Sequence, residues 1–378
     1  MVELTTLALM GPLYAGEGGS SGLFRAVNLR DPGRPALIYK DYRPETLHRL
    51  DRDVLNRLVA RRALLEPSAR RHCALPIDVV THGGEPRGFL MPEAPRTYLW
   101  LDGAGRPAER GATGFRMPRT GEELCRTREV TKDGIVRRTY STGHQLNALG
   151  HLLALISALH RAGFVLGDLQ PRNFLLGHRR VPARVFLVDC DSFQVEGVST
   201  LPSREPEAWR VPARPGGHDR ATDLAKFALL TQRALQRHWG EEADLDSLRG
   251  MVPPAHAEVL SRLWECARVS DDELVRLMRW LCWAEIGKPQ TWVSALRGLD
   301  VSGMRAALSI AREPQGLEGF RYVVPDRPLT VSAQHPHPPS VKFRRPPRRR
   351  WAIWLFGGFA CYMAVLGLLE LLGFIQLH

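Results

Sequence analysis

Apolar residues along this chain follow two periods, which change from one block of sequence to the next. Near the amino terminus, short apolar runs bounded by glycine and proline predict strands. These runs are residues 4–14, 23–27, 36–40 and 88–92. Leucine and valine recur at helical spacing across residues 45–65 and predict one helix between the last two strands. The first 92 or so residues therefore predict a small β-rich unit.

Beyond residue 141 the period is mostly helical. Apolar positions across 145–162 predict an amphipathic helix, and short strands are expected directly after Asn173 and at 185–189. Further helices are expected at 219–235, 254–267, 271–286 and 289–298.

The intervening residues, about 93–141, are rich in glycine, proline, arginine and threonine and show little periodicity. We interpret them as an insertion, either facing a substrate or without fixed structure. The pattern thus predicts an α+β protein with a β-rich lobe at about 1–92 and an α-rich lobe at about 142–300.

The carboxyl-terminal part has a different character. Residues 301–350 form a proline-rich and finally basic linker, and the 19 residues from Trp351 to Leu369 carry no charge. A transmembrane helix is expected over 351–375. The preceding arginines favour a cytoplasmic position for everything before the span. The chain is therefore expected to be single-pass and tail-anchored in the plasma (inner) membrane, with residues 342–350 on anionic lipid.

Composition supports an ordinary globular protein, with 44% apolar and 24% charged residues. The net charge is +12, and half of that excess lies within 342–350. Because the membrane linker accounts for this half, we expect no nucleic-acid partner. The six cysteines form no C-x-x-C pair, so neither a zinc site nor a disulfide framework is indicated.

The candidate chemistry lies in residues 164–176. Asp168 and Asn173 are five positions apart, between the apolar helix and an apolar strand. A carboxylate in such a turn can accept the proton of an attacking hydroxyl, and an amide oxygen can hold Mg²⁺ against nucleotide phosphates. This arrangement suits phosphoryl transfer.

The stretch resembles the catalytic loop of the protein-kinase-like superfamily, H-R-D-L-x-x-x-N, with Asp168 and Asn173 on the Asp and Asn. The resemblance implies a two-lobed kinase-like fold of the bacterial, eukaryotic-like Ser/Thr type. Leu166 and Gly167 replace the His and Arg. Gln170 stands where such kinases usually place a lysine on the γ-phosphate, and Arg172 is a candidate to supply the missing charge.

Lys40 ends a strand as the phosphate-binding lysine of this superfamily does. It is one of only five lysines among 52 basic residues, which favours a specific role. Met91 falls at the hinge that the resemblance implies, where backbone groups hold the adenine. Glycines at 16–22 resemble the phosphate-covering loop; the candidates for nucleotide binding are Gly16, Gly18, Gly19 and Gly22.

The strand at 185–189 ends in Asp189-Cys190-Asp191, where the resemblance implies a magnesium ligand. Asp189 aligns with that position and Asp191 is the alternative. The acidic partner of Lys40 is open, with Asp53 the first candidate and Asp51 the second.

Two further matches lie downstream. Asp223 resembles the helix aspartate that holds the catalytic-loop backbone. The pattern Asp-x-Asp-Ser-Phe-Gln at 189–194 is similar to a bacterial kinase-like subgroup associated with a type 2C protein phosphatase and a von Willebrand A-type protein.

The resemblance implies ATP and Mg²⁺ as cofactors and a membrane-anchored protein serine/threonine kinase as the function, with a protein substrate and a phosphatase partner. Asp168, Lys40 and Gln170 are the catalytic candidates, and Asn173, Asp189 and Asp191 the metal candidates. Two alternatives stay open. One is a pseudokinase that binds nucleotide as a scaffold, suggested by the altered motifs, and the other is a small-molecule phosphotransferase.

Overall fold

The structure of the protein is a computed structural model. It describes residues 1–15, 20–31, 37–100, 109–110, 115–125, 140, 142–177, 184–201, 206–215, 217–237 and 244–283.

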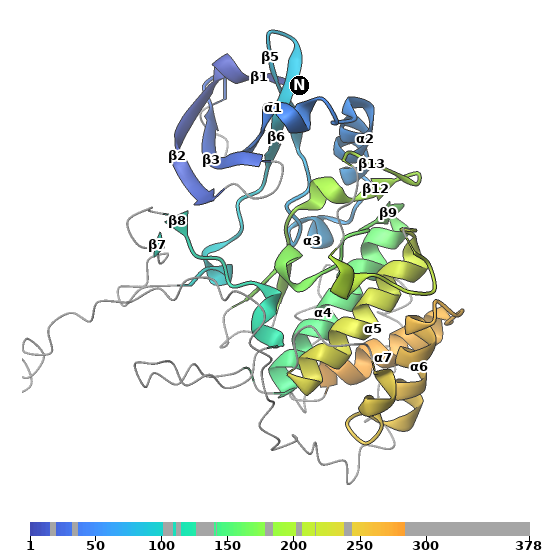
Figure 1. Ribbon diagram of the computed structural model, residues 1–378. Helices are drawn as coiled ribbons and strands as arrows, with labels where there is room; N and C mark the ends of the chain where they lie inside the picture. Colours follow the sequence, from blue (N-terminus) through green and yellow to red (C-terminus); the bar gives the residue numbers. More distant parts are fainter. Residues whose placement is uncertain are drawn as a thin grey trace, which may run out of the picture. The chain divides into compact units, whose positions relative to one another are not determined.

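A six-stranded sheet forms the amino-terminal part and curls in Figure 1. The strand order is β1-β5-β6-β4-β3-β2, and all neighbours are antiparallel except β1 and β5. The strands are β1 Val2–Glu3, β2 Leu7–Ala15, β3 Ser20–Asn28, β4 Leu37–Tyr42, β5 Asp78–His82 and β6 Glu85–Met91.

Strand β4 lies between β3 and β6, so Ile38, Tyr39 and Lys40 are all buried. Strands β5 and β6 are joined by Gly83 and Gly84, whose φ angles of 61° and 85° match the two-residue turns that suit the twist of a hairpin. The central position of β4 fixes the lysine at the middle of the sheet.

The helix expected at 45–65 is wrong in its extent, because the structure divides it. The chain forms α1 Pro44–Leu47, turns, and begins again as α2 Arg52–Arg62. The Asp51 side chain accepts hydrogen bonds from the backbone amides of Asp53 and Val54, both at 3.0 Å. It therefore caps α2 and begins a new helix.

Four longer helices form most of the remainder and lie together in Figure 1. They are α4 Thr142–Arg161, α5 Arg220–Gln236, α6 Pro254–Trp264 and α7 Asp271–Trp283. Helix α4 packs against both α5 and α7, and most of its residues are buried, which explains its high content of leucine and alanine. None of the helices in the described ranges is both long and apolar enough to cross a bilayer.

Short strands and 3-10 turns connect these helices and carry the candidate site. Strands β10 and β11 form a hairpin, and β12 pairs with both β9 and β13. The remaining short helix, strands and turns are α3 Pro67–Arg70, β7 Glu109–Arg110, β8 Phe115–Arg116, β9 Phe164–Val165, β10 Phe174–Leu176, β11 Val185–Leu187, β12 Gln194–Val195, β13 Val198–Ser199, η1 Leu4–Thr6, η2 Arg96–Tyr98, η4 Gly121–Leu124, η5 Pro171–Asn173, η6 Cys190–Ser192, η7 Glu207–Trp209 and η8 Leu245–Leu248.

One hydrophobic core runs from the sheet into the helices. It includes Ile38 and Phe89 of the sheet, Leu55 of α2, Leu152 of α4 and Leu229 of α5. A smaller cluster covers the other face of the sheet, around Tyr39, Val80 and Leu90 of its central strands.

The protein is therefore a mixed α+β fold, with the sheet first and the helices after it, as the sequence predicts. Several expectations lie outside the described residues. These are the glycines at 16–19, much of the insertion at 93–141, the helix at 289–298, the linker at 301–350 with its lipid-binding run at 342–350, and the membrane span at 351–375.

Candidate functional site

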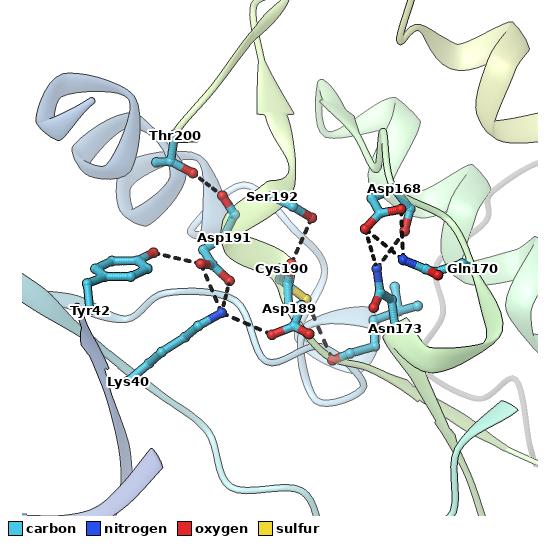
Figure 2. A network of polar contacts seen from close by, with 11 residues as sticks. Lys40, Tyr42, Asp168, Gln170, Asn173, Asp189, Cys190, Asp191, Ser192 and Thr200 are labelled. Atoms are coloured by element: carbon cyan, nitrogen blue, oxygen red, sulfur yellow. Dashed lines mark hydrogen bonds and ion pairs between the residues drawn. The ribbon is translucent and has the colours of Figure 1, made fainter. Parts of the chain in front are cut away.

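The loop after β9 brings Asp168 and Asn173 into direct contact (Figure 2). The amide nitrogen of Asn173 donates to the Asp168 carbonyl oxygen at 2.8 Å and to the Asp168 carboxylate at 2.9 Å. Gln170 donates to both oxygens of the same carboxylate, at 3.0 and 2.9 Å. The turn η5, with Pro171 at its first position, closes the loop and sets this spacing.

Asp223 of α5 holds the backbone of this loop from behind. Its carboxylate is fully buried and accepts from the backbone amides of Leu166 at 2.8 Å and Gly167 at 2.9 Å. His160 at the end of α4 lies 2.9 Å from the same carboxylate, and Lys226 donates to the Gly167 carbonyl oxygen. The expectation that Asp223 fixes the loop backbone is confirmed.

Gly167 has a φ of 72°, in the left-handed region that side chains disfavour. A side chain here would carry a backbone cost even though its Cβ would lie an ordinary 3.7 Å from the His218 ring. The loop conformation thus gives a physical reason for glycine where the resemblance places arginine.

Lys40 faces two carboxylates that come from the turn after β11 (Figure 2). Its Nζ lies 3.0 Å from Asp189 Oδ1, and 2.9 and 3.0 Å from the two oxygens of Asp191. Burial alone would lower the pKa of Lys40, but the carboxylates of Asp189 and Asp191 outweigh burial and raise the pKa above its ordinary value. The ammonium group is therefore charged.

The two acids differ in their surroundings. The Asp191 side chain is only 4% exposed, whereas the Asp189 side chain is 56% exposed. Asp189 also has a φ of 53°, an uncommon backbone conformation for any residue other than glycine. Unusual backbone conformations gather at functional sites, and this one presents an accessible carboxylate.

Further contacts fix Asp191 in place. The Tyr42 hydroxyl donates to Asp191 Oδ2 at 2.6 Å, and Thr200 Oγ1 donates to the Asp191 carbonyl oxygen. Burial, together with the Asp191 charge, raises the pKa of Tyr42 well above its ordinary value, so the hydroxyl keeps its proton. Tyr42 was absent from the sequence-based candidates, although alternation along a strand places it on the same face as Lys40.

Neither sequence-based candidate is the partner of Lys40. Asp51 caps α2, and Asp53 is exposed on that helix. Helix α2 packs against β12, close to this turn, but it presents no carboxylate to Lys40. Asp189 and Asp191 supply the carboxylates instead.

The residues present suit a magnesium ion at one place. Phe174 pairs with Leu187 across the β10–β11 hairpin, and the Val188 amide donates to the Asn173 carbonyl oxygen at 2.9 Å. Asn173 and Asp189 therefore flank the same end of the hairpin. Among the described residues, Asn173 Oδ1 and Asp189 Oδ2 accept no hydrogen bond, which leaves two hard oxygen ligands for the ion.

Asp191 fits the ion less well, because both of its oxygens are taken by Lys40 and Tyr42. No cluster of three or more histidine, cysteine or acidic side chains suited to a metal occurs within the described ranges. The remaining ligands of a magnesium ion would be water and phosphate, as is usual for this ion at nucleotides.

The other candidates lie around this centre. Met91 is the last residue of β6 and pairs with Ile38, as expected for a strand that ends there. Gly22 lies inside β3, so the expected loop is shorter than residues 16–22. Arg172 is exposed and pairs with Glu122 at 2.7 Å; it forms no contact with Asp168 in the described structure.

Comparison with models of known protein families finds no match, and comparison with curated proteins finds none either.

Proposed function

We propose that the chain is a phosphotransferase with a two-lobed, protein-kinase-like fold, and that it transfers the γ-phosphoryl group of ATP to a serine or threonine hydroxyl of a protein. One observation carries this proposal. Asp168 and Asn173 are bonded to each other in one loop, and that loop shares a hairpin end with Asp189, which in turn contacts a buried lysine.

Asp168 is the proposed base. A carboxylate offers about four acceptor positions, and Gln170 and Asn173 occupy three of them here. The remaining position can accept the proton of a substrate hydroxyl. Because the two amides hold the carboxylate from one side, they orient it without adding charge. Gln170 is thus a positioning residue for Asp168.

Asn173, Asp189 and Lys40 are the proposed nucleotide-binding residues. When bound, ATP would supply the phosphoryl group, and magnesium would neutralise the charge that develops as this group is transferred. Asn173 and Asp189 would hold the ion through the oxygens that accept no hydrogen bond, and Lys40 would hold a phosphate oxygen. The charge of Lys40 is already secured by its two carboxylates.

The test is transfer of label from [γ-³²P]ATP by the purified full-length chain with Mg²⁺. We expect label on the chain itself or on a basic protein substrate, and a loss of about 10²- to 10⁴-fold in Asp168→Asn. Asp189→Asn should lose transfer as well. Asp246→Asn is the matched control, because Asp246 is exposed and pairs with Arg249 on the surface.

The outcomes separate the alternatives. Nucleotide binding without transfer to any substrate would contradict the kinase proposal and favour the scaffold. Transfer to small hydroxyl compounds in place of proteins would favour the small-molecule phosphotransferase.

The proposed setting is the cytoplasmic face of the plasma (inner) membrane, with residues 351–375 as the anchor and 342–350 on anionic lipid. A phosphatase of type 2C is a proposed partner. A chain ending at residue 341 should be lost from the membrane fraction that retains the full-length chain. Equal retention of both chains would contradict the anchor.

A further inference from the structure

The two carboxylates on Lys40 have separate structural roles. Asp191 contacts the ammonium group through both oxygens and is buried, whereas Asp189 contacts it through Oδ1 alone and is largely exposed. A buried lysine needs a counter-charge that stays with it, because an unpaired buried charge is costly. Asp191 meets this need without Asp189.

Asp191 is itself held by groups that do not touch the exposed face of the site. The Tyr42 hydroxyl donates to Oδ2, and Thr200 holds the Asp191 backbone. Thr200 is tied in turn to α2, since its carbonyl oxygen accepts from the Asp51 amide at 2.9 Å. The carboxylate therefore keeps its position whatever Asp189 binds.

Helix α2 is attached to the same segment but supplies no acid to Lys40. Arg57 and Arg61 of α2 pair with Glu196, just after β12, at 3.3 and 2.9 Å. The helix therefore contributes packing, while the lysine's carboxylates come from a turn three residues long, η6, and the residue before it.

We propose that Asp191 is the positioning residue that holds Lys40 for phosphate binding, while Asp189, two residues earlier, is left to bind the metal ion. This rests on the proposed function. Asp189 can exchange Lys40 for an ion because Asp191 keeps the lysine paired. Tyr42 is a second positioning residue, acting through Asp191.

Lysine modification tests the pairing without any nucleotide. Reductive methylation of the full-length chain, read by mass spectrometry, is simple to assign because the chain has five lysines. Lys40 is 11% exposed and should react slowly. We expect Asp191→Asn to raise its rate about tenfold, the ratio that corresponds to one lost hydrogen bond to a charged group. Asp189→Asn should change it less, and buried Lys226 serves as the internal control.

Nucleotide affinity tests the division of roles. The dissociation constant of a fluorescent ATP analogue is measured for each variant with Mg²⁺ and with chelator. Asp191→Asn should weaken binding about tenfold in both conditions and keep the effect of Mg²⁺. Asp189→Asn should remove most of the effect of Mg²⁺.

Each outcome decides the matter. Loss of the magnesium effect in Asp191→Asn, or a faster Lys40 reaction in Asp189→Asn than in Asp191→Asn, would overturn the assignment. If Asp191→Asn does not fold, Tyr42→Phe removes only the bond to Oδ2 and should give a smaller change in the same direction. If the wild-type chain binds no nucleotide, the proposed function fails, while the methylation rates still decide which acid pairs with Lys40.

Discussion

Two aspartates at the candidate site are buried, and they accept hydrogen bonds from different kinds of donor. Asp223 accepts from two backbone amides and faces His160, whereas Asp191 accepts from the side chains of Lys40 and Tyr42. Asp223, the backbone anchor, fixes the course of the loop because it binds main-chain amides. Asp191, the side-chain anchor, fixes the position of the Lys40 charge because it binds side chains.

The largest effect is expected at the backbone anchor. Asp223→Ala leaves two backbone amides of the loop and His160 without their acceptor inside the protein. We expect the free energy of unfolding to fall by about 4 kcal/mol, because each buried unpaired donor costs about 1–3 kcal/mol. Urea unfolding of the full-length chain followed by circular dichroism measures it.

Asp246→Ala is the control for Asp223→Ala, because its exposed pair with Arg249 should be worth less than about 1 kcal/mol. A similar small loss in both variants would show that Asp223 is not an anchor.

The pair of Lys40 and Asp191 should respond differently, because both side chains can be replaced in one variant. Lys40→Met should lose about 3 kcal/mol, because the buried Asp191 carboxylate is left without a cation. Asp191→Leu should lose less, because Asp189 still contacts the lysine. The double variant should lose less than the sum by about 2 kcal/mol, since two apolar side chains can pack where the ion pair was. The same unfolding measurements give this coupling energy, and additive losses would contradict a buried pair.

The sequence led to Asp223 through a family resemblance, and it did not lead to the contact between Lys40 and Asp191. Asp168 and Asn173 lie in one local pattern, where a helix, a turn and a strand fix their spacing. The role of Asp223, 57 positions from Leu166, was implied by the resemblance. The contact between Lys40 and Asp191 joins residues 151 positions apart. Only the packing of the sheet against the turn after β11 decides it, so no local period reveals it.

The start of helix α2 is a second feature that the local sequence pattern does not predict. Leucine spacing across 45–65 fits one helix, but Asp51 caps a new one at Arg52. Once that carboxylate serves as a cap, it cannot also serve Lys40. Helical period is a property of apolar positions and says nothing of which polar side chain turns back onto the backbone.

A smaller effect is expected where the loop backbone itself is unusual. Gly167→Ala should lower the free energy of unfolding by about 1 kcal/mol, because a φ of 72° is unfavourable for alanine. Gly217→Ala is a matched control: its Cβ would also meet its nearest neighbour at 3.7 Å, without a positive φ. Equal effects in the two variants would mean that the backbone conformation at Gly167 is not the cause.

A pair of histidines, His151 buried and His72 half-buried, lies beside the hairpin that Asn173 and Asp189 flank, and it adds a dependence on pH to this region. The rings of His72 and His151 lie 4.7 Å apart, and the Val185 amide of β11 donates to His151 Nδ1 at 3.3 Å. Burial, with the positive charge of Arg184, lowers the pKa of His72 to about 4. Burial also lowers the pKa of His151, well below its ordinary value.

At neutral pH the smallest effect is expected from this pair, because its contribution changes only in acid. Well above pH 6.5 both rings are neutral in the folded and the unfolded chain. As the pH falls from about 6.5 to about 4, His72 binds a proton in the unfolded chain but stays neutral in the folded chain. The free energy of unfolding therefore decreases across this window. His72→Asn should flatten the fall in unfolding free energy between these pH values, whereas His48→Asn, at an exposed position, should leave it unchanged. An unchanged slope in His72→Asn would show that the ring is protonated in the folded chain, and the hairpin would then lack this sensitivity to acid.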